Sequence, residues 1–262
     1  MTAALSFCEI FHAGAALAEG AAAGRMAEVG KRGELRVCIW PDYFAMSWRN
    51  PRTHALEGMD IDMAEALARR LRVRLRFVET NFADFADRLD KDDCDIAMMG
   101  VGITPEREER MAFSRPYLAS PVYVVTPRNS PRVRQWSDLD RPGIVIAVVA
   151  GSRMEPLMRE TLRQADLLVL RSPLSREQEV LSGRADAFMS DYPYTRRVLE
   201  TQDWAQVIEP PDRFGNTLYA YAVRKGDPAW LAEVNAFLDA ARADGTLANA
   251  ASRHALSPVL VQ

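Results

Sequence analysis

Hydrophobic and polar positions follow two alternating periodicities from Leu35 onward. Three short stretches are apolar or alternate with period two, as half-buried and buried strands do, and they occupy residues 35–40, 73–79 and 95–99. Apolar residues repeat at helical spacing over 61–71, where Asp60 is a candidate helix cap, and a second helix is expected near 82–90. Strands that alternate with helices predict an α/β fold, here one small doubly wound lobe.

The same pattern begins again after an extended, proline-containing stretch at 117–128. Further strands are predicted at residues 144–150, 167–172 and 187–191, with a helix at 155–164. A second extended stretch leads from residue 217 into a long amphipathic helix that starts at Asp227 and Pro228. We therefore expect lobe 1 over residues 33–119 plus 220–262, and lobe 2 over residues 120–219.

The first 32 residues are expected to be a signal-like or disordered segment. Residues 1–24 are small, apolar and rich in alanine, and Ala16 to Ala18 fit a signal-peptidase site. The signal is imperfect, because a basic region is lacking and Glu9 and His12 interrupt the apolar run. A start codon assigned downstream of the true one is the alternative. Either reading predicts a periplasmic protein.

Composition and charge exclude several classes of function. Of 262 residues, 48% are hydrophobic and 26% charged, and the net charge is −3. These values are ordinary for a soluble globular protein and argue against a nucleic-acid partner. The three histidines are isolated in the sequence, so we expect no metal site and no cofactor. Cys38 and Cys94 occupy apolar strand positions; buried free thiols are favoured there, and a disulfide is the alternative if their strands are neighbours.

Candidate chemistry is densest between Cys94 and Tyr117. Gly100 and Gly102 end a buried strand and allow the backbone to approach a ligand, and Thr104-Pro105 begins a helix that carries Arg107. A guanidinium beside free backbone N–H groups forms a receptor for a carboxylate. The alternative is a surface arginine paired with a neighbouring glutamate on its helix.

Three motifs resemble those of the type 2 periplasmic solute-binding proteins, in the polar amino-acid family that serves ABC importers. They are T-x-x-R followed by F-S-x-P-Y, then GMDIDMA at 58–64, and GRADAFMSD at 183–191. The resemblance covers about residues 33–255. It implies two α/β lobes joined by a two-strand hinge, a ligand cleft between them, a monomer, and an ABC permease of the inner membrane as partner.

The resemblance also implies roles for individual residues. Asp191, at the end of a predicted strand, would receive the ligand's α-ammonium, although capping the following helix is a competing role. Tyr43, Phe82 and Trp40 would form the aromatic wall of the pocket, with packing in the core as the alternative. Asp42 lies close by in the sequence and would bind a ligand amine or solvent.

Two departures from the family pattern leave the ligand open. Gly102 replaces a serine or threonine, so only its backbone N–H remains for a carboxylate. The usual Gly-Thr-Thr of lobe 2 is Gly151-Ser152-Arg153; Ser152 keeps a hydroxyl, while Arg153 introduces a cation. Arg153 either turns to solvent or adds a second anion receptor, which would favour an acidic ligand.

The favoured function is binding of a small amino acid or related zwitterion without catalysis, as the solute-binding component of an importer. A binder of a dicarboxylate is one alternative, and a sensory input module is another. The rival from a different class is an enzyme: cyclohexadienyl and arogenate dehydratases resemble the same family and place a glutamate general acid after the lobe 2 turn. This chain has Met154 at that place and Glu155 next to it.

Overall fold

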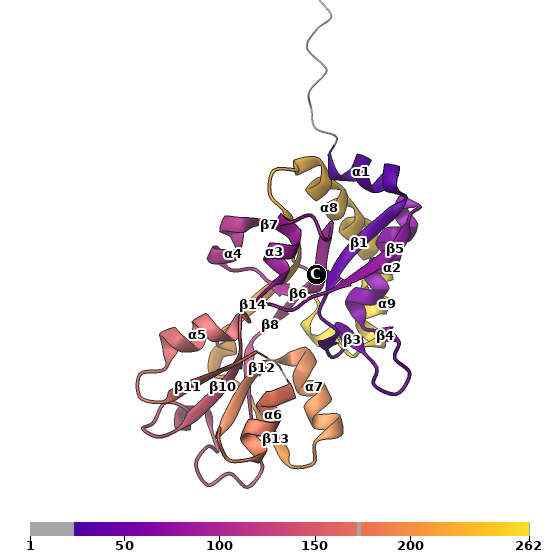
Figure 1. Ribbon diagram of the computed structural model, residues 1–262. Helices are drawn as coiled ribbons and strands as arrows, with labels where there is room; N and C mark the ends of the chain where they lie inside the picture. The colour runs from indigo at the N-terminus through magenta and orange to yellow at the C-terminus, as the bar shows by residue number, and fades with distance from the viewer. Residues whose placement is uncertain (1–23, 172–173, 262) are drawn as a thin grey trace, which may run out of the picture.

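The computed structural model describes residues 24–171 and 174–261, which form two α/β lobes (Figure 1). The predicted signal segment, through residue 23, lies outside the described residues. Lobe 1 contains a mixed sheet with the strand order β5 (Arg74–Glu79), β1 (Glu34–Ile39), β6 (Ile96–Gly102), β14 (Thr217–Arg224) and β7 (Met111–Phe113), in which β5, β1 and β6 pair in parallel and β14 is antiparallel to its neighbours. A small antiparallel sheet joins β2 (Asp42–Tyr43), β3 (Ser47–Arg49) and β4 (Leu56–Glu57).

Lobe 2 is built around a second sheet of the same kind. Its strand order is β11 (Asp166–Leu170), β10 (Val145–Val149), β12 (Ala187–Asp191), β9 (Val122–Pro127) and β13 (Ala205–Ile208). β10 pairs in parallel with β11 and β12, whereas β9 runs antiparallel to β12. The predicted α/β class with two doubly wound lobes is confirmed.

Two extended passages connect the lobes, and they lie side by side (Figure 1). On the first passage, β8 (Leu118–Ser120) is followed directly by β9 of the lobe 2 sheet. On the second, the chain leaves β13 and enters β14, which pairs with β8 in antiparallel register. This pairing is the two-strand hinge that the resemblance implied.

Helices pack around both sheets. Lobe 1 carries α1 (Arg25–Arg32), α2 (Met59–Leu71), α3 (Phe85–Asp90), α4 (Pro105–Arg110), α8 (Pro228–Ala243) and α9 (Thr246–Arg253). Lobe 2 carries α5 (Met154–Thr161), α6 (Leu174–Leu181) and α7 (Tyr192–Thr201). Within residues 24–171 and 174–261, none of the helices combines the length and apolar character needed to cross a membrane.

Helix α2 corrects one local prediction. Gly58 is the residue before its first turn, so Asp60 lies inside the helix and does not cap it. Its side chain is fully buried and faces the core of lobe 1. The sequence shows an acidic residue near a helix start, and only the structure shows that the helix begins two residues earlier.

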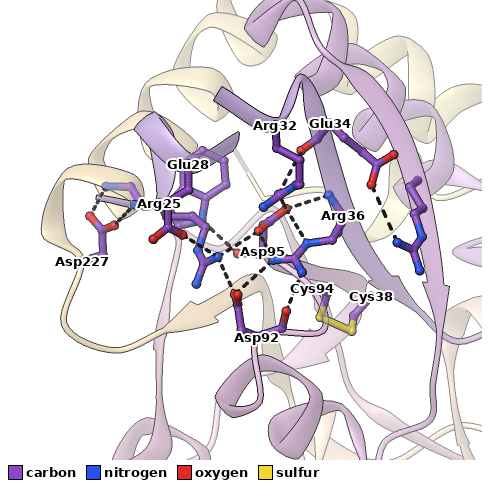
Figure 2. Close-up of polar contacts among 12 residues, drawn as sticks. Arg25, Glu28, Arg32, Glu34, Arg36, Cys38, Asp92, Cys94, Asp95 and Asp227 are labelled. Carbon is purple, nitrogen blue, oxygen red and sulfur yellow. Dashed lines mark hydrogen bonds and ion pairs between the residues drawn. A yellow bond between two sulfur atoms is a disulfide. The ribbon is translucent and has the colours of Figure 1, made fainter. Parts of the chain in front are cut away.

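The prediction of a signal-like or disordered segment up to residue 32 does not hold for residues 25–32. These residues form α1, and Arg25 is 7% exposed. Figure 2 shows the reason: Asp95, at the entry to β6, is buried and accepts hydrogen bonds from the side chains of Arg25 (3.2 Å), Arg32 (2.5 Å) and Arg36 (2.9 Å). Helix α1 is thus held on lobe 1 by buried ion pairs.

Cys38 and Cys94 form a disulfide, so the favoured prediction of free thiols is wrong (Figure 2). Cys38 lies on β1, and Cys94 lies two residues before β6, which pairs in parallel with β1. The Cα atoms are 5.6 Å apart, within the range that a disulfide requires. Spacing along the sequence could not show that these two strands are neighbours.

Candidate functional site

Arg107 spans the two lobes. Helix α4 begins after Thr104, whose hydroxyl accepts a hydrogen bond from the Arg107 N–H at 3.3 Å. The guanidinium donates through Nη1 to the carbonyl of Gly102 at 2.7 Å and through Nη2 to the carbonyl of Gly151, on lobe 2, at 2.9 Å. The side chain therefore turns into the space between the lobes, and does not pair with a glutamate of its own helix.

Aromatic rings hold the Arg107 guanidinium in this position. Its Cζ lies 5.6 Å from the ring centre of Phe82 and 5.4 Å from that of Phe85, distances typical of cation–π contacts. Burial lowers the pKa of Arg107 to about 10, so the group stays charged at neutral pH. Phe82 also packs against Trp40 and Tyr43, with ring centres 5.0 and 5.7 Å away, so the three predicted aromatics form one cluster.

Asp191 lies at the end of β12 and is 7% exposed. Its Oδ1 accepts the N–H of Tyr194 at 3.2 Å, which is the helix-capping role that competed with ligand binding in the sequence analysis. Its Oδ2 accepts the hydroxyl of Tyr43 from lobe 1 and that of Tyr219, on β14, at 2.9 Å. Asp191 thus caps helix α7, and its carboxylate also faces lobe 1. Its role as receptor for a ligand ammonium stays a prediction.

Burial raises the pKa of both tyrosines, and the negative charge of Asp191 raises each further. Tyr43 and Tyr219 are therefore neutral hydrogen-bond donors at any physiological pH. A ligand ammonium that reaches Asp191 must displace at least one of these hydroxyls or share the carboxylate with it.

A small cavity of about 30 Å³ lies between the lobes. Among its lining residues are Trp40, Tyr43 and Phe82 from lobe 1, and Ser152, Met154 and Asp191 from lobe 2. This volume accommodates water but not an amino acid. The hydroxyl of Ser152 is buried and has no hydrogen-bond partner among the described residues. Such a group is a natural donor to a ligand oxygen.

Close approach of the lobes depends on Gly151. Its φ of +68° lies in the left-handed region, and a Cβ added there would come within 2.7 Å of the Cα of Ala83, on lobe 1. Any side chain at this position would therefore hold the lobes apart.

The other predicted site residues lie at different distances from the cavity. Arg153 reaches between the lobes, since a Cβ on Gly102 would be 3.4 Å from its Cδ. Burial lowers the pKa of Arg153, while Tyr219 and Asp191 oppose that change. Asp42, on β2, is half-buried, and this burial raises its pKa; it does not line the cavity.

Gly100 does not offer its N–H to the cleft, contrary to prediction. Its N–H donates to Oδ2 of Asp60 at 2.7 Å, inside lobe 1, and the hydroxyl of Tyr117 donates to the same oxygen at 2.8 Å. A Cβ on Gly100 would lie 2.7 Å from Cε1 of Tyr43, so this glycine makes room for a cavity residue. Asp60 thus supports the back of the site.

Burial raises the pKa of Asp60 from 3.8 to about 7. The folded protein then binds this proton more tightly than the unfolded chain, so stability falls as the pH rises from about 4 to about 7. Asp60→Asn, which stays neutral, should remove up to about 4 kcal/mol of that decrease between pH 4 and 8. Urea unfolding at several pH values measures it.

Glu65→Gln serves as the control, because Glu65 is exposed on the same helix and its ion pair with Arg69 spans 3.6 Å. That variant should keep the slope of the unmodified protein. Equal pH slopes for Asp60→Asn and Glu65→Gln would show that Asp60 is not protonated in the folded state.

Three residues around the site were not predicted from the sequence: Tyr219, which contacts Asp191, and Tyr194 and Arg176, which line the cavity. Tyr219 begins a run of five consecutive buried residues on β14, so the apolar pattern predicts burial but not the contact with Asp191. Tyr194 and Arg176 line the cavity from α7 and α6. A lone arginine in an amphipathic helix carries no sequence signal for such a position. Among the residues that the structure describes, no cluster of three potential metal ligands occurs.

Comparisons with known proteins agree with this architecture. Cyclohexadienyl dehydratase of Pseudomonas aeruginosa is 29% identical over 85% of this chain and 83% of its own length. The L-cystine-binding protein TcyJ of Escherichia coli is 26% identical over 86% of this chain and 83% of its own length. The crystal structure of the ancestral amino acid-binding protein AncCDT-1, a precursor of cyclohexadienyl dehydratase, superposes with a TM-score of 0.80 at 32% identity and covers 87% of this chain and 98% of that one.

The sequence profile of the bacterial extracellular solute-binding proteins, family 3, matches residues 35–256. This span includes both sheets, both hinge passages and every cavity residue described above. The chain belongs to the bacterial extracellular solute-binding proteins of family 3.

Proposed function

We propose that this protein is the solute-binding component of an ABC importer and that it binds a small amino acid in the cleft between its lobes. The observation that carries the proposal is the pair of opposite charges in one cleft, Arg107 from lobe 1 and Asp191 from lobe 2. Tyr219 lies between the two charges. Its hydroxyl donates to Asp191. On β14 it lies opposite Gly102 of β6, whose carbonyl accepts a hydrogen bond from Arg107. A zwitterion needs such a two-pole site.

Relatives in the family support the class of ligand but not one amino acid. The names of similar proteins include glutamine-binding GlnH of Bacillus subtilis and an arginine-binding protein of Escherichia coli. We infer that delivery to a permease follows binding, as in an importer of this family, and that the protein acts outside the cytoplasm as a monomer.

Catalysis is not needed for this function, and the position of Glu155 disfavours it. The Glu155 carboxylate accepts the N–H of Gly151 and a bond from Arg159, each at 2.9 Å, and does not line the cavity. Met154 lines it instead. The similarity to cyclohexadienyl dehydratase nevertheless makes an enzyme the second candidate. Incubation with a cyclohexadienyl substrate tests it, because loss of water and aromatisation would produce a new ultraviolet absorbance.

Ligand binding should make the protein contract. The cavity is too small to admit an amino acid, so the lobes must separate before binding and close afterwards, and contacts from both lobes stabilise only the closed state. Calorimetry with a panel of amino acids identifies a ligand, and small-angle scattering then compares the protein with and without it. An unchanged radius of gyration at saturation would contradict closure, and the absence of binding by any amino acid would contradict the proposed function.

A further inference from the structure

Two arginines, one from each lobe, converge on Gly102. A Cβ added to Gly102 would lie 3.6 Å from Nη1 of Arg107 and 3.4 Å from Cδ of Arg153. It would also lie 2.9 Å from Cγ2 of Thr217, so this position has no room for a side chain. The aliphatic stem of Arg153 therefore borders the place beside Arg107 where the side chain of a serine or threonine would begin. Arg153 is thus directed into the cleft.

Arg153 belongs to the same turn of lobe 2 that Arg107 contacts. Arg107 donates to the carbonyl of Gly151, and Ser152 and Arg153 follow directly in the chain. Arg153 is partly buried, and it makes no hydrogen bond or ion pair with any residue that the structure describes. Its Nη2 lies 3.0 Å from the position that a Cβ on Gly215 would occupy, on the second passage between the lobes.

Neither guanidinium forms an ion pair with a carboxylate of the described residues. Arg107 donates to two backbone carbonyls instead. Asp191 acts on Arg153 through its charge, without a hydrogen bond, and its oxygens already accept two tyrosine hydroxyls and a backbone N–H. Burial is the main cause of the lowered pKa of Arg107, and the positive charge of Arg153 adds to it. Repulsion between the two guanidinium groups and their burial are both unfavourable, and an anion between them would offset both.

A hydrogen-bond donor lies on the same turn. Ser152 is 7% exposed and lines the small cavity, and its hydroxyl has no partner within residues 24–171 and 174–261. A buried hydroxyl without a partner costs free energy, which a hydrogen bond to a ligand oxygen would recover. The turn after β10 thus offers a hydroxyl and a guanidinium to an anion that Arg107 holds from lobe 1.

We propose that Arg153 is a second receptor for the α-carboxylate of the ligand, so that Arg107 of lobe 1 and Arg153 of lobe 2 hold one carboxylate between them, with Ser152 as an additional donor. The carboxylate replaces a repulsion across the cleft with two attractions, and closure then depends on the anionic end of the ligand. This inference rests on the proposed function, since it assigns a contact in the same cleft. It concerns the group that all α-amino acids share and gives no preference among side chains.

Amino acids compared with their α-carboxamides test the role of Arg153. The amide keeps the side chain and the ammonium but lacks the anion, and at about pH 6 both ammonium groups stay charged. Calorimetry with the standard L-amino acids finds the binders, and each amide is then titrated in competition with its amino acid, so that weak binding is measured. The ratio of the two affinities should be at least about 100 in the unmodified protein and should fall at least about tenfold in Arg153→Gln.

Further variants separate the charge of Arg153 from its packing. Arg153→Lys keeps the charge without the planar fork, so the ratio should fall less than in Arg153→Gln. Arg163→Gln removes an exposed arginine of lobe 2 and should leave the ratio unchanged. Melting curves show whether each variant is folded. If Arg153→Gln is not, Arg153→Met, which keeps an apolar stem beside Gly102, carries the same comparison.

The outcomes distinguish this inference from the proposed function. An amide that binds the unmodified protein as tightly as its amino acid would overturn the inference. Equal losses for the amino acid and its amide in a folded Arg153→Gln would also overturn it, because Arg153 would then only shape the cleft. Both results leave the proposed function in place, whereas failure of every amino acid to bind would remove both.

Discussion

Arg107→Ala is expected to weaken amino-acid binding by at least about 100-fold, because two charge-assisted hydrogen bonds to the ligand carboxylate are lost. In the structure, the guanidinium already bridges the lobes through the carbonyls of Gly102 and Gly151. Its loss therefore removes both the proposed ligand contact and a contact between the lobes. Calorimetry with the best ligand of the unmodified protein measures the change.

Arg110→Ala is the matched control on the same helix. Arg110 is exposed and pairs with Asp87 and Asp90 on the surface of lobe 1, so its removal should leave ligand affinity unchanged. Melting curves of both variants separate a binding defect from a folding defect. If Arg107→Ala is folded and binds as tightly as the unmodified protein, Arg107 is not the carboxylate receptor.

Asp95→Asn should destabilise the protein by about 3–5 kcal/mol, because it removes the charge shared by three arginines in a buried network. The Asp95 side chain is fully buried, and Arg25 and Arg36 are almost so. Asp92 also contacts these two arginines, at 2.5 and 3.0 Å, but it lies near the surface and cannot reach the position of Asp95. The midpoint of urea unfolding measures the loss.

An exposed ion pair provides the comparison. Asp239 pairs with Arg115 at the surface, where both side chains are about half exposed, so Asp239→Asn should cost no more than about 1 kcal/mol. A similarly small loss for Asp95→Asn would mean that the network around α1 contributes little to folding. Detachment of α1 in the variant would appear as faster proteolysis near Arg25.

Much of the fold follows from periodicity because strands and helices of an α/β lobe bury different sets of positions. The stretch 144–150 is continuously apolar and becomes β10, between two neighbouring strands. The start of α4 also follows from local chemistry, since Thr104 caps it and Pro105 occupies its first turn. The place of Arg107 in the first turn of this helix could therefore be predicted from the sequence.

Contacts between segments that are distant in the sequence could not be predicted. The burial of Arg25 depends on Asp95, which is 70 residues away, and a run of helix-forming residues next to a leader gives no sign of it. Arg176 reaches the cavity because α6 packs beside β12, a tertiary fact without a local pattern. Asp60 marks a helix start in the sequence, yet its burial and hydrogen bond to Gly100 arise only when α2 packs on β6.

The disulfide makes the two lobes unequal in their response to redox conditions. The bond between Cys38 and Cys94 closes a loop of 56 residues in lobe 1, and residues 120–219 contain no cysteine at all. Constraint of the unfolded chain by such a loop stabilises a protein by about 2–4 kcal/mol. A reductant would therefore loosen lobe 1 and spare lobe 2. Protein made in a reducing cytosol would carry the intact Asp191 half of the cleft beside a weakened Arg107 half.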